Sequence, residues 1–373
     1  MMNKNDVHWI CGDQEPETRQ VILAKQGGKV VPAGVMQGIY ERIKTPHKYG
    51  IVVKGEDGER IDSPSVFRHG DKWYMLYIIY TKGMGYETAL AESNDLLEWT
   101  KLGKILHFRD GAWDAHQAAG YVALQHHEWG GPYTLHQHDA KYWISYLGGN
   151  TPGYEAGRLG IGVASTDDPT TAKPWTRLDR PVLSPDQPDV RKFDDSTLYK
   201  SHIIRDDAES LGFPYVMYYN AKGKHETIGM AVSQNMLDWR RYGQDPVIDN
   251  GSGISGDPQI TKIGDVWVMF YFGAGWKKGI FDTFACSYDM VKWTKWEGPH
   301  LTEPSEPWDN VGANKPWVIF HDGIVYHFYH SRCGTVDSPT DNAIAVATSK
   351  DMLANENRKT EPTHNKTDAS DGK

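Results

Sequence analysis

The stretch Asp62-Ser63-Pro64-Ser65-Val66-Phe67 opens the unit that decides the fold, because the rest of the chain repeats it. A polar turn at 69–72 follows, and then an aromatic run, Trp73-Tyr74-Met75-Leu76-Tyr77-Ile78. The unit closes with Ala91-Glu92-Ser93-Asn94-Asp95-Leu96-Leu97-Glu98-Trp99. Short β-prone runs bounded by polar turns are typical of antiparallel strands. The order predicts a small sheet that ends in a capped turn and a Trp.

Both ends of this unit recur along the chain. The closing tag, Ser-x-Asp or Ser-x-Asn followed by Trp, returns at 164–175, 232–239, 286–293 and 348–353, and the last copy stops short of its Trp. The aromatic run returns in step at 142–146, 215–219, 267–271 and 325–329. A repeat of about 55 to 70 residues indicates a radial or solenoidal architecture, in which each sheet must stack on its neighbours. We expect the tag itself to be scaffold.

The repeats predict an all-β fold, a five-bladed β-propeller at residues 46–354. Sheets around an axis bury every face and leave only short edges. Because the chain turns polar after Leu353, the last blade is one strand short. The N-terminal segment 1–45 is expected to supply a closing strand, at Val21–Ala24 or Val30–Val31. The polar tail 355–373 is expected to be disordered.

Composition excludes several classes of protein. A net charge of -9 argues against nucleic acid as a partner. No run of about 18 apolar residues is present, so no membrane span is expected. The first residues lack the apolar segment of a secretory signal, which predicts a cytoplasmic location, or a periplasmic one if a signal has been removed. Cys11, Cys286 and Cys333 fit free thiols better than a disulfide framework or a zinc site.

Two carboxylates stand where chemistry is expected. In a propeller the first strand of each blade lines the central channel, and these strands are expected to start at 62–66, 119–122, 199–203, 256–260 and 314–318. Asp62 and Asp257 come just ahead of Pro64 and Pro258, which places them on one rim from different blades. Glycosidic bond cleavage requires two facing carboxylates, of which one attacks or activates water and the other donates a proton. The alternative is that each Asp caps a turn before Pro.

An aromatic residue followed by Asp recurs ahead of three inner strands, at Trp113-Asp114, Phe193-Asp194 and Trp308-Asp309. Such regular recurrence favours a structural role for these pairs. Asp195 breaks the pattern by adding a second carboxylate. We expect Asp195 to be a third acid that orients a sugar hydroxyl or tunes a neighbour's pKa.

Other polar residues near these strands are candidates for substrate binding, although each one alone is equally explained as an ordinary blade contact. They are His116, Gln117, Lys200, His202, Asn314, Lys315, His330 and Arg332. A His-rich segment at 126–139 has the residue types of a metal site but no fixed ligand spacing, and a solvated loop is predicted there. No metal is expected in the chemistry, and a structural cation in the central channel stays open.

The five units, the Asp-x-Pro-Ser-Val opening and the tags together resemble the five-bladed propeller glycosidases, over about residues 50–353. That group includes glycoside hydrolase family 43 and the related families 32, 117 and 130. The resemblance implies an Asp base or nucleophile in blade one, a pKa-tuning Asp in blade three and an acid in blade four. Asp62, Asp195 and Asp257 match these blades in order.

The chain departs from family 43 at two of these positions. Ser63 separates Asp62 from Pro64, and Asp257 stands where the family has Glu within Glu-Gly-Pro. Another group, such as His202, could therefore donate the proton.

The resemblance implies a hydrolase of oligosaccharides, inverting, and exo-acting if the connections 103–120 and 300–315 wall the site. One alternative is a phosphorylase, in which Lys200, His202, Lys315 and Arg332 would hold phosphate. The other is a non-catalytic propeller that binds sugar or protein. A homo-oligomer stays open.

Overall fold

The computed structural model describes residues 28–56, 58–335 and 339–353, and within them the chain is almost entirely β-structure. The exception is α1 (Ala33–Ile43), which the sequence reading missed. Its apolar face packs on Phe270 and Phe284 of a neighbouring sheet. The strand suggested at Val30–Val31 is not formed, because Pro32 follows and α1 begins at once. The other suggestion, Val21–Ala24, and the tail 355–373 lie outside the described residues.

The strands form antiparallel sheets, mostly in chain order. The first run is β2 (Glu59–His69), β3 (Lys72–Thr81), β4 (Gly85–Ser93) and β5 (Thr100–Leu106). It joins β6 (Gln117–Val122), β7 (Tyr142–Gly149), β8 (Gly160–Thr166) and β9 (Thr176–Arg177) through one parallel pair, Tyr86 with Gln117. Next come β10 (Thr197–Arg205), β11 (Tyr215–Lys222), β12 (Glu226–Ser233) and β13 (Trp239–Arg241). Then follow β14 (Ile254–Ile263), β15 (Val266–Ala274), β16 (Ile280–Ser287) and β17 (Thr294–Lys295).

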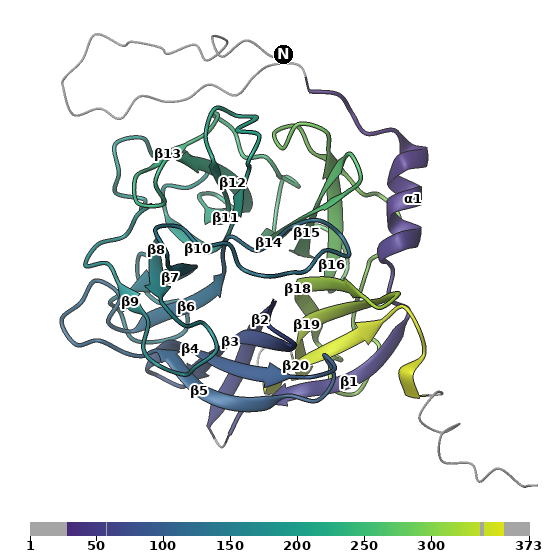
Figure 1. The fold of residues 1–373 in the computed structure, drawn as a ribbon, viewed down its shortest axis with the longest axis horizontal. Coiled ribbons are helices and arrows are strands. Elements are labelled where there is room, and N and C mark those ends of the chain that lie inside the picture. The colour runs from purple at the N-terminus through teal and green to yellow at the C-terminus, as the bar shows by residue number, and fades with distance from the viewer. Residues whose placement is uncertain (1–27, 57, 336–338, 354–373) are drawn as a thin grey trace, which may run out of the picture.

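The last sheet combines the two ends of the described chain. Its strands are β18 (Gly312–His321), β19 (Ile324–Gly334), β20 (Pro339–Thr348) and β1 (His47–Lys54). β1 pairs antiparallel with β20, from His47 opposite Thr348 to Lys54 opposite Ala343. The sheets are arranged around a common centre, with β2, β6, β10, β14 and β18 nearest to it (Figure 1). The predicted all-β fold of several sheets is confirmed, and each range predicted to start an inner strand lies within a strand of the structure.

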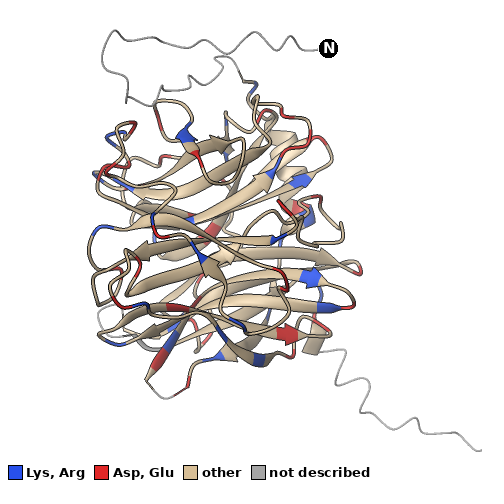
Figure 2. Cartoon of the chain, turned by 60° about the vertical axis from the view of Figure 1, so that its left-hand side comes forward, with Lys and Arg blue, Asp and Glu red and all other residues tan. Residues whose placement is uncertain are grey.

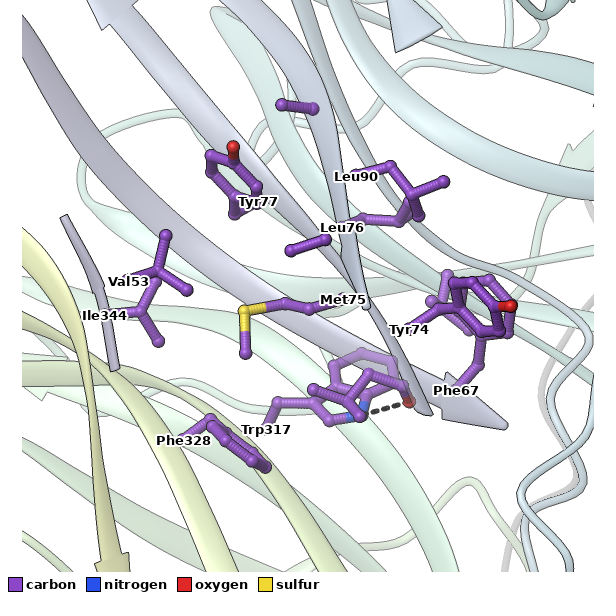
Figure 3. Packing of buried hydrophobic residues seen from close by; sticks show 14 of the residues in the cluster. Val53, Phe67, Tyr74, Met75, Leu76, Tyr77, Leu90, Trp317, Phe328 and Ile344 are labelled. Carbon is purple, nitrogen blue, oxygen red and sulfur yellow. Dashed lines mark hydrogen bonds between the residues drawn. The ribbon is translucent and has the colours of Figure 1, made fainter. Parts of the chain in front are cut away.

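The first and last sheets pack against each other through apolar side chains. Trp317 on β18 and Phe328 on β19 lie beside Met75 on β3 (Figure 3). The indole Nε1 of Trp317 donates a hydrogen bond of 2.9 Å to the carbonyl of Val66 on β2. A fully buried Trp that also satisfies its one polar atom fixes how the two sheets face each other.

The Ser-x-Asp tags are turns whose backbone is held by their own side chains. In the first, Ser93 Oγ accepts from the Leu96 amide at 2.9 Å, and Asp95 Oδ1 accepts from the amides of residues 97 and 98. The indole of Trp99 returns a hydrogen bond to the Leu96 carbonyl. The tags at Ser233 and Ser287 repeat this pattern. The scaffold role predicted for the tags is therefore confirmed.

The aromatic-Asp pairs are also structural. Asp114, Asp194 and Asp309 are fully buried, and each pairs with a cation from an outer strand. Those cations are Arg177 on β9, Arg241 on β13 and Lys48 on β1. Each pair ties the connection before an inner strand to the outer edge of its sheet. The charged side chains of the molecule are otherwise spread over its loops and strand ends, with both signs interspersed (Figure 2).

One connection covers the centre at the ends of the inner strands. Residues 123–138, between β6 and β7, cross the middle of the molecule there (Figure 1). Their hydrogen bonds to other inner strands join Leu124 to Ile203, Gln125 to Val66, Trp129 to Lys262 and Tyr133 to Phe320. The described residues contain no helix with the length and apolar character needed to cross a membrane.

Candidate active site

Three inner strands have the same backbone distortion, each within the first five residues of the strand. Ser63, Asp257 and Lys315 have φ values of 38°, 55° and 65°, and each precedes a Pro. Strand pairing slips at the same three places. A bulge re-aims a side chain, and a positive φ at a residue other than Gly costs about 1–3 kcal/mol. Ser63, and not Asp62, is therefore the residue of β2 that is structurally equivalent to Asp257 and Lys315.

Asp62 is 3% exposed and surrounded by hydrogen-bond donors. Lys315 Nζ lies 2.8 Å from its Oδ2, and the amide and hydroxyl of Ser63 donate to its Oδ1 at 2.7 and 3.0 Å. Burial alone would raise the pKa of Asp62, but the charges and hydrogen bonds around it outweigh burial and hold that pKa well below its usual range. His330 Nδ1 lies 3.3 Å away, and burial lowers the pKa of that imidazole to about 3. Lys315 is therefore the counter-ion that keeps Asp62 ionised.

Asp257 lies next to Asp62. The Ser63 hydroxyl is 3.2 Å from Asp257 Oδ2 and also within hydrogen-bonding distance of Asp62, so it bridges the two carboxylates. Lys200 Nζ lies 3.9 Å from Asp257 and is fully buried between the rings of Tyr121 and Trp317. Burial lowers the pKa of Lys200 to about 8.

A carboxylate that the sequence reading missed faces this group. Glu155 lies on the loop 150–158 between β7 and β8, and the hydroxyl of Tyr86 donates to its Oε1 at 3.2 Å. Burial and, to a smaller extent, the charge of Asp62 raise the pKa of Glu155, and the charge of Lys315 lowers it. The net result is a pKa of about 7. We call Asp62, Glu155, Lys200, Asp257, Lys315 and His330 the central cluster.

Gln117 holds the Glu155 loop in place. Its amide Nε2 donates to the carbonyls of Thr151 and Gly153 at 2.8 and 2.7 Å. Gln117 is fully buried at the start of β6. A residue predicted to bind substrate therefore positions the loop that carries Glu155.

The central cluster combines two carboxyl groups with opposite tendencies. The pKa of Asp62 lies below its usual range and that of Glu155 above it. Glu226, at the start of β12, also has a raised pKa through burial, which a hydrogen bond from Asn220 only partly offsets. Pairs of carboxyl groups whose environments push their pKa values apart mark the acid and the base of a site.

Comparison with known proteins gives the family. No family model and no curated protein matches the sequence. Among solved structures, one named as a complex of BT0996 with RGII and one named glycoside hydrolase are each 44% identical to it. Each match covers 86% of this chain and 96% of the other chain, and each has a TM-score of 0.83. The protein belongs to the propeller-type glycoside hydrolases.

A thermostable family-43 glycoside hydrolase shares the fold of the enzyme at 17% identity. Its TM-score is 0.59, and the match covers 81% of this chain and 91% of that one. The resemblance inferred from the repeats is confirmed.

The remaining predicted residues of this glycosidase are placed as follows. His202 is buried, with Nδ1 accepting from the Ile260 amide at 2.9 Å, and burial lowers its pKa to about 3. Such an imidazole is uncharged near neutral pH and is therefore a poor general acid. Asn314 is buried opposite His330 in the β18–β19 pair. Arg332 is half-buried opposite Gly312, and the ring of His116 lies 6.0 Å from that of Phe108.

Asp195 is exposed, two residues before β10, whereas its neighbour Asp194 is the buried structural carboxylate. The structure therefore does not place Asp195 among the buried acids of the central cluster. Glu155 and Glu226 supply the further carboxylates instead. Asp-Pro and aromatic-Asp patterns could not reveal either one, because Glu155 sits in an irregular loop and Glu226 in an ordinary-looking strand.

The histidines of the segment 126–139 make ring contacts with one another and with a neighbouring strand. The rings of His126 and His136 stack at 5.9 Å, and His127 lies 4.9 Å from Trp267. Across residues 28–56, 58–335 and 339–353, no group of three or more His, Cys, Asp or Glu side chains is arranged to hold a metal.

Proposed function

We propose that the enzyme is an exo-acting, inverting glycoside hydrolase on a five-bladed propeller closed by β1. Asp62 is the general base and Glu155 the general acid. The observation that carries this assignment is the opposite shift of their pKa values within one cluster. Near neutral pH, Asp62 is ionised and Glu155 retains a proton, which are the states that the two roles demand.

In the proposed reaction Glu155 protonates the glycosidic oxygen as its bond to the anomeric carbon breaks. Asp62 takes a proton from a water that attacks the same carbon from the opposite face, so the sugar leaves with inverted configuration. Lys315 keeps Asp62 ionised, and Ser63 fixes its orientation. The family-43 resemblance supports inversion, for which carboxyl groups about 6.5–9.5 Å apart leave room for the water.

Asp257 and Glu226 complete the proposed site. Asp257 shares the Ser63 hydroxyl with Asp62, so its charge acts on both catalytic carboxyl groups. Both Asp257 and Glu226 raise the pKa of Glu155 through their negative charge. We assign them to tuning the acid, the role that was expected of Asp195.

Hydrolysis is favoured over phosphorolysis because both lysines of the central cluster already face carboxylates. Lys315 is paired with Asp62 and Lys200 faces Asp257, so neither is free to bind phosphate. The charges of these two lysines are already balanced by Asp62 and Asp257. The two lysines therefore leave no uncompensated positive charge to hold phosphate or an anionic sugar, and an uncharged sugar ring is the proposed reacting group.

The loop 150–158 supports exo action. It carries both Glu155 and the half-exposed ring of Tyr154, which lies 5.3 Å from Tyr80 and 5.7 Å from Tyr86. Aromatic side chains beside an acid suit a terminal sugar. The substrate is proposed to be an oligosaccharide, because a structure 44% identical to this protein is named as a complex with RGII.

The test is a screen of oligosaccharides, those of RGII among them, and of aryl furanosides and pyranosides. Each substrate is tested with and without phosphate and with and without EDTA. Release of one terminal sugar, indifferent to both additives, is expected, since no step in the scheme uses a metal. Proton NMR of the first product should show inverted anomeric configuration. Phosphate-dependent turnover would point to a phosphorylase, and binding without any turnover to a sugar-binding propeller.

A further inference from the structure

The buried aromatic-Asp pairs differ in charge, and the difference marks a second region of the molecule. Asp194 and Asp309 are hydrogen-bonded by tyrosine hydroxyls and by backbone amides, with one outer-strand cation each. Asp114 instead pairs with two arginines. Arg109 binds its Oδ1 at 2.7 Å and Arg177 its Oδ2 at 3.1 Å. Arg109 thus adds a cation that the other two copies do without.

This extra charge is only weakly compensated. Asp179 lies 3.8 Å from Arg109 but is fully exposed, and such surface pairs contribute little. Glu87, 3.6 Å from His107, is already paired with Lys104 at 2.7 Å. Burial and the neighbouring Arg109 lower the pKa of Arg177, although Asp114 opposes them. An anion would relieve this excess of positive charge.

The two arginines line a cleft of about 450 Å³. Its other walls include His107, Phe108, Pro174 and Trp175. Trp175 is 4% exposed, and its indole Nε1 has no hydrogen-bond partner in the part of the chain that the structure describes. The cleft therefore combines guanidinium groups, apolar ring faces and a buried donor that lacks an acceptor. Sugar-binding sites combine such aromatic and polar groups.

The cleft lies at the same end of the first sheet as the central cluster. Asp62 pairs with Ile78, Ile78 with Thr88, and Thr88 with Leu106 at the sheet's outer edge. Ile105 and His107, the residues on either side of Leu106, both line the cleft. It is separated from Asp62 by the width of the sheet.

We propose that this cleft is a second saccharide-binding site, for a sugar residue that carries a carboxylate. The Nε and Nη2 atoms of Arg109 already donate to Asp114 and Leu178, so its Nη1 atom binds the carboxylate through a charge-assisted hydrogen bond. The apolar faces of Phe108 and Pro174 pack on the sugar ring, and the Trp175 indole donates to a ring substituent. The central cluster, whose lysines are already paired with Asp62 and Asp257, selects an uncharged sugar, so the two sites differ in charge preference.

The test measures binding and is independent of turnover. Ligand-detected NMR titrations compare glucuronate with glucose, and galacturonate with galactose, because each pair differs only in carboxylate against hydroxymethyl. Acetate tests charge without a ring. We expect the uronates to bind the full-length enzyme at least about 10-fold more tightly than their neutral partners or acetate.

Three variants locate the site. Arg109→Gln keeps a donor for the buried Asp114 but removes the charge, and should weaken uronate binding about 10-fold or more. Arg158→Gln is the matched control, because Arg158 is an exposed arginine paired with Asp186 away from the cleft, and it should bind as the wild type does. Asp62→Asn should also leave uronate binding unchanged.

Equal binding of uronates and neutral sugars would overturn the proposal. So would loss of binding in Asp62→Asn, which would place the ligand in the central cluster. Should Arg109→Gln prove unstable on melting, Phe108→Ala and Asp179→Asn decide the question. Phe108→Ala should weaken uronate binding, and Asp179→Asn should strengthen it by removing a competing carboxylate. No change in either variant would reject the site.

Discussion

Two sets of buried aspartates differ in their roles. Asp114, Asp194 and Asp309 are structural, whereas Asp62 and Asp257 belong to the central cluster. Asp194 accepts from the Arg191 amide at 2.6 Å, from the Tyr219 hydroxyl at 2.8 Å and from the Arg241 guanidinium at 2.5 Å. Among the described residues, Asp257 in the central cluster has only a 3.2 Å contact from Ser63 and a lysine 3.9 Å away. Burial does not distinguish Asp194 from Asp257, but the number of their hydrogen bonds does.

Backbone geometry separates the same two sets. Asp257 and Lys315 in the central cluster, and Ser63 beside Asp62, are pre-proline residues with positive φ, whereas Asp114, Asp194 and Asp309 are absent from the residues with positive φ. Strain is retained where the surrounding structure enforces it, and it collects at functional sites. The comparison indicates that Asp194 uses up its hydrogen-bonding capacity within the scaffold, whereas Asp257 keeps some, and Asp62 directs its own toward Ser63 and Lys315 of the site. The same substitution in each set therefore separates turnover from stability.

The largest effect is expected from Asp62→Asn. The amide still accepts from Ser63, and Lys315 keeps Asp257 as a neighbouring negative charge, so the chain should stay folded. Loss of the general base should lower turnover about 10²- to 10⁴-fold. Turnover measured beside the melting temperature checks this. Near-normal turnover in a folded variant would remove Asp62 from the mechanism.

Glu155→Gln should show an effect that depends on the leaving group. A natural sugar leaving group needs the proton, so turnover should fall about 10²- to 10⁴-fold, whereas an activated aryl group should lose far less. Asp62→Asn should affect both substrates alike. Equal losses for the two leaving groups in Glu155→Gln would refute its role as the acid.

The pH dependence should follow Glu155. A general acid must be protonated, and with a pKa of about 7 its protonated fraction falls as the pH rises through that value. The rate should then drop about 10-fold per pH unit above 7, while Asp62, with its lowered pKa, stays ionised from pH 5 to 7. The alkaline limb near 7 should disappear in Glu155→Gln. A wild-type rate that is flat from pH 6 to 9 would contradict this assignment.

Asp194→Asn should reverse the pattern of Asp62→Asn. Removing one partner of a buried pair costs about 3–5 kcal/mol, and the lower value is expected because Asp189 still pairs with Arg241 at 2.8 Å. Urea unfolding should report this loss, while the folded variant should turn over substrate at close to the wild-type rate. A stable Asp194→Asn with impaired turnover would assign the aromatic-Asp pairs to catalysis.

The sequence predicted the repeating parts of the molecule because repetition is visible in residue order. Tags, aromatic strands and Asp-x-Pro openings recur at positions that a single sequence can reveal. Asp62, Asp257, Lys200 and Lys315 were singled out because each lies near the start of a predicted inner strand. Glu155 was missed because its role depends on a loop folding back over other strands. The strand β1, which pairs with β20, was not predicted because its sequence resembles no other strand of the repeat.

Gln117 offers the smallest and most selective test, because the chain contains a matched counterpart. Gln117 Nε2 donates to two carbonyls of the loop that carries Glu155, and Gln125 Nε2 donates to the carbonyls of Val66 and Tyr133 at 2.7 and 3.1 Å. Both glutamines are buried. Gln117→Met and Gln125→Met each remove two hydrogen bonds from a side-chain amide to backbone carbonyls and keep a similar side-chain volume. Each variant should therefore lose about 1–3 kcal/mol of stability.

Only Gln117→Met should affect catalysis. The Glu155 loop loses its anchor, so kcat should fall about 10-fold with little change in KM, and the alkaline limb should move as the environment of Glu155 relaxes. Gln125 holds the connection at the ends of the inner strands away from Asp62, where a loosened loop leaves the carboxyl groups in place. Steady-state kinetics across pH, beside urea unfolding of both variants, separates the two roles. An equal fall in kcat for both would show that Gln117 acts through general stability and not through Glu155.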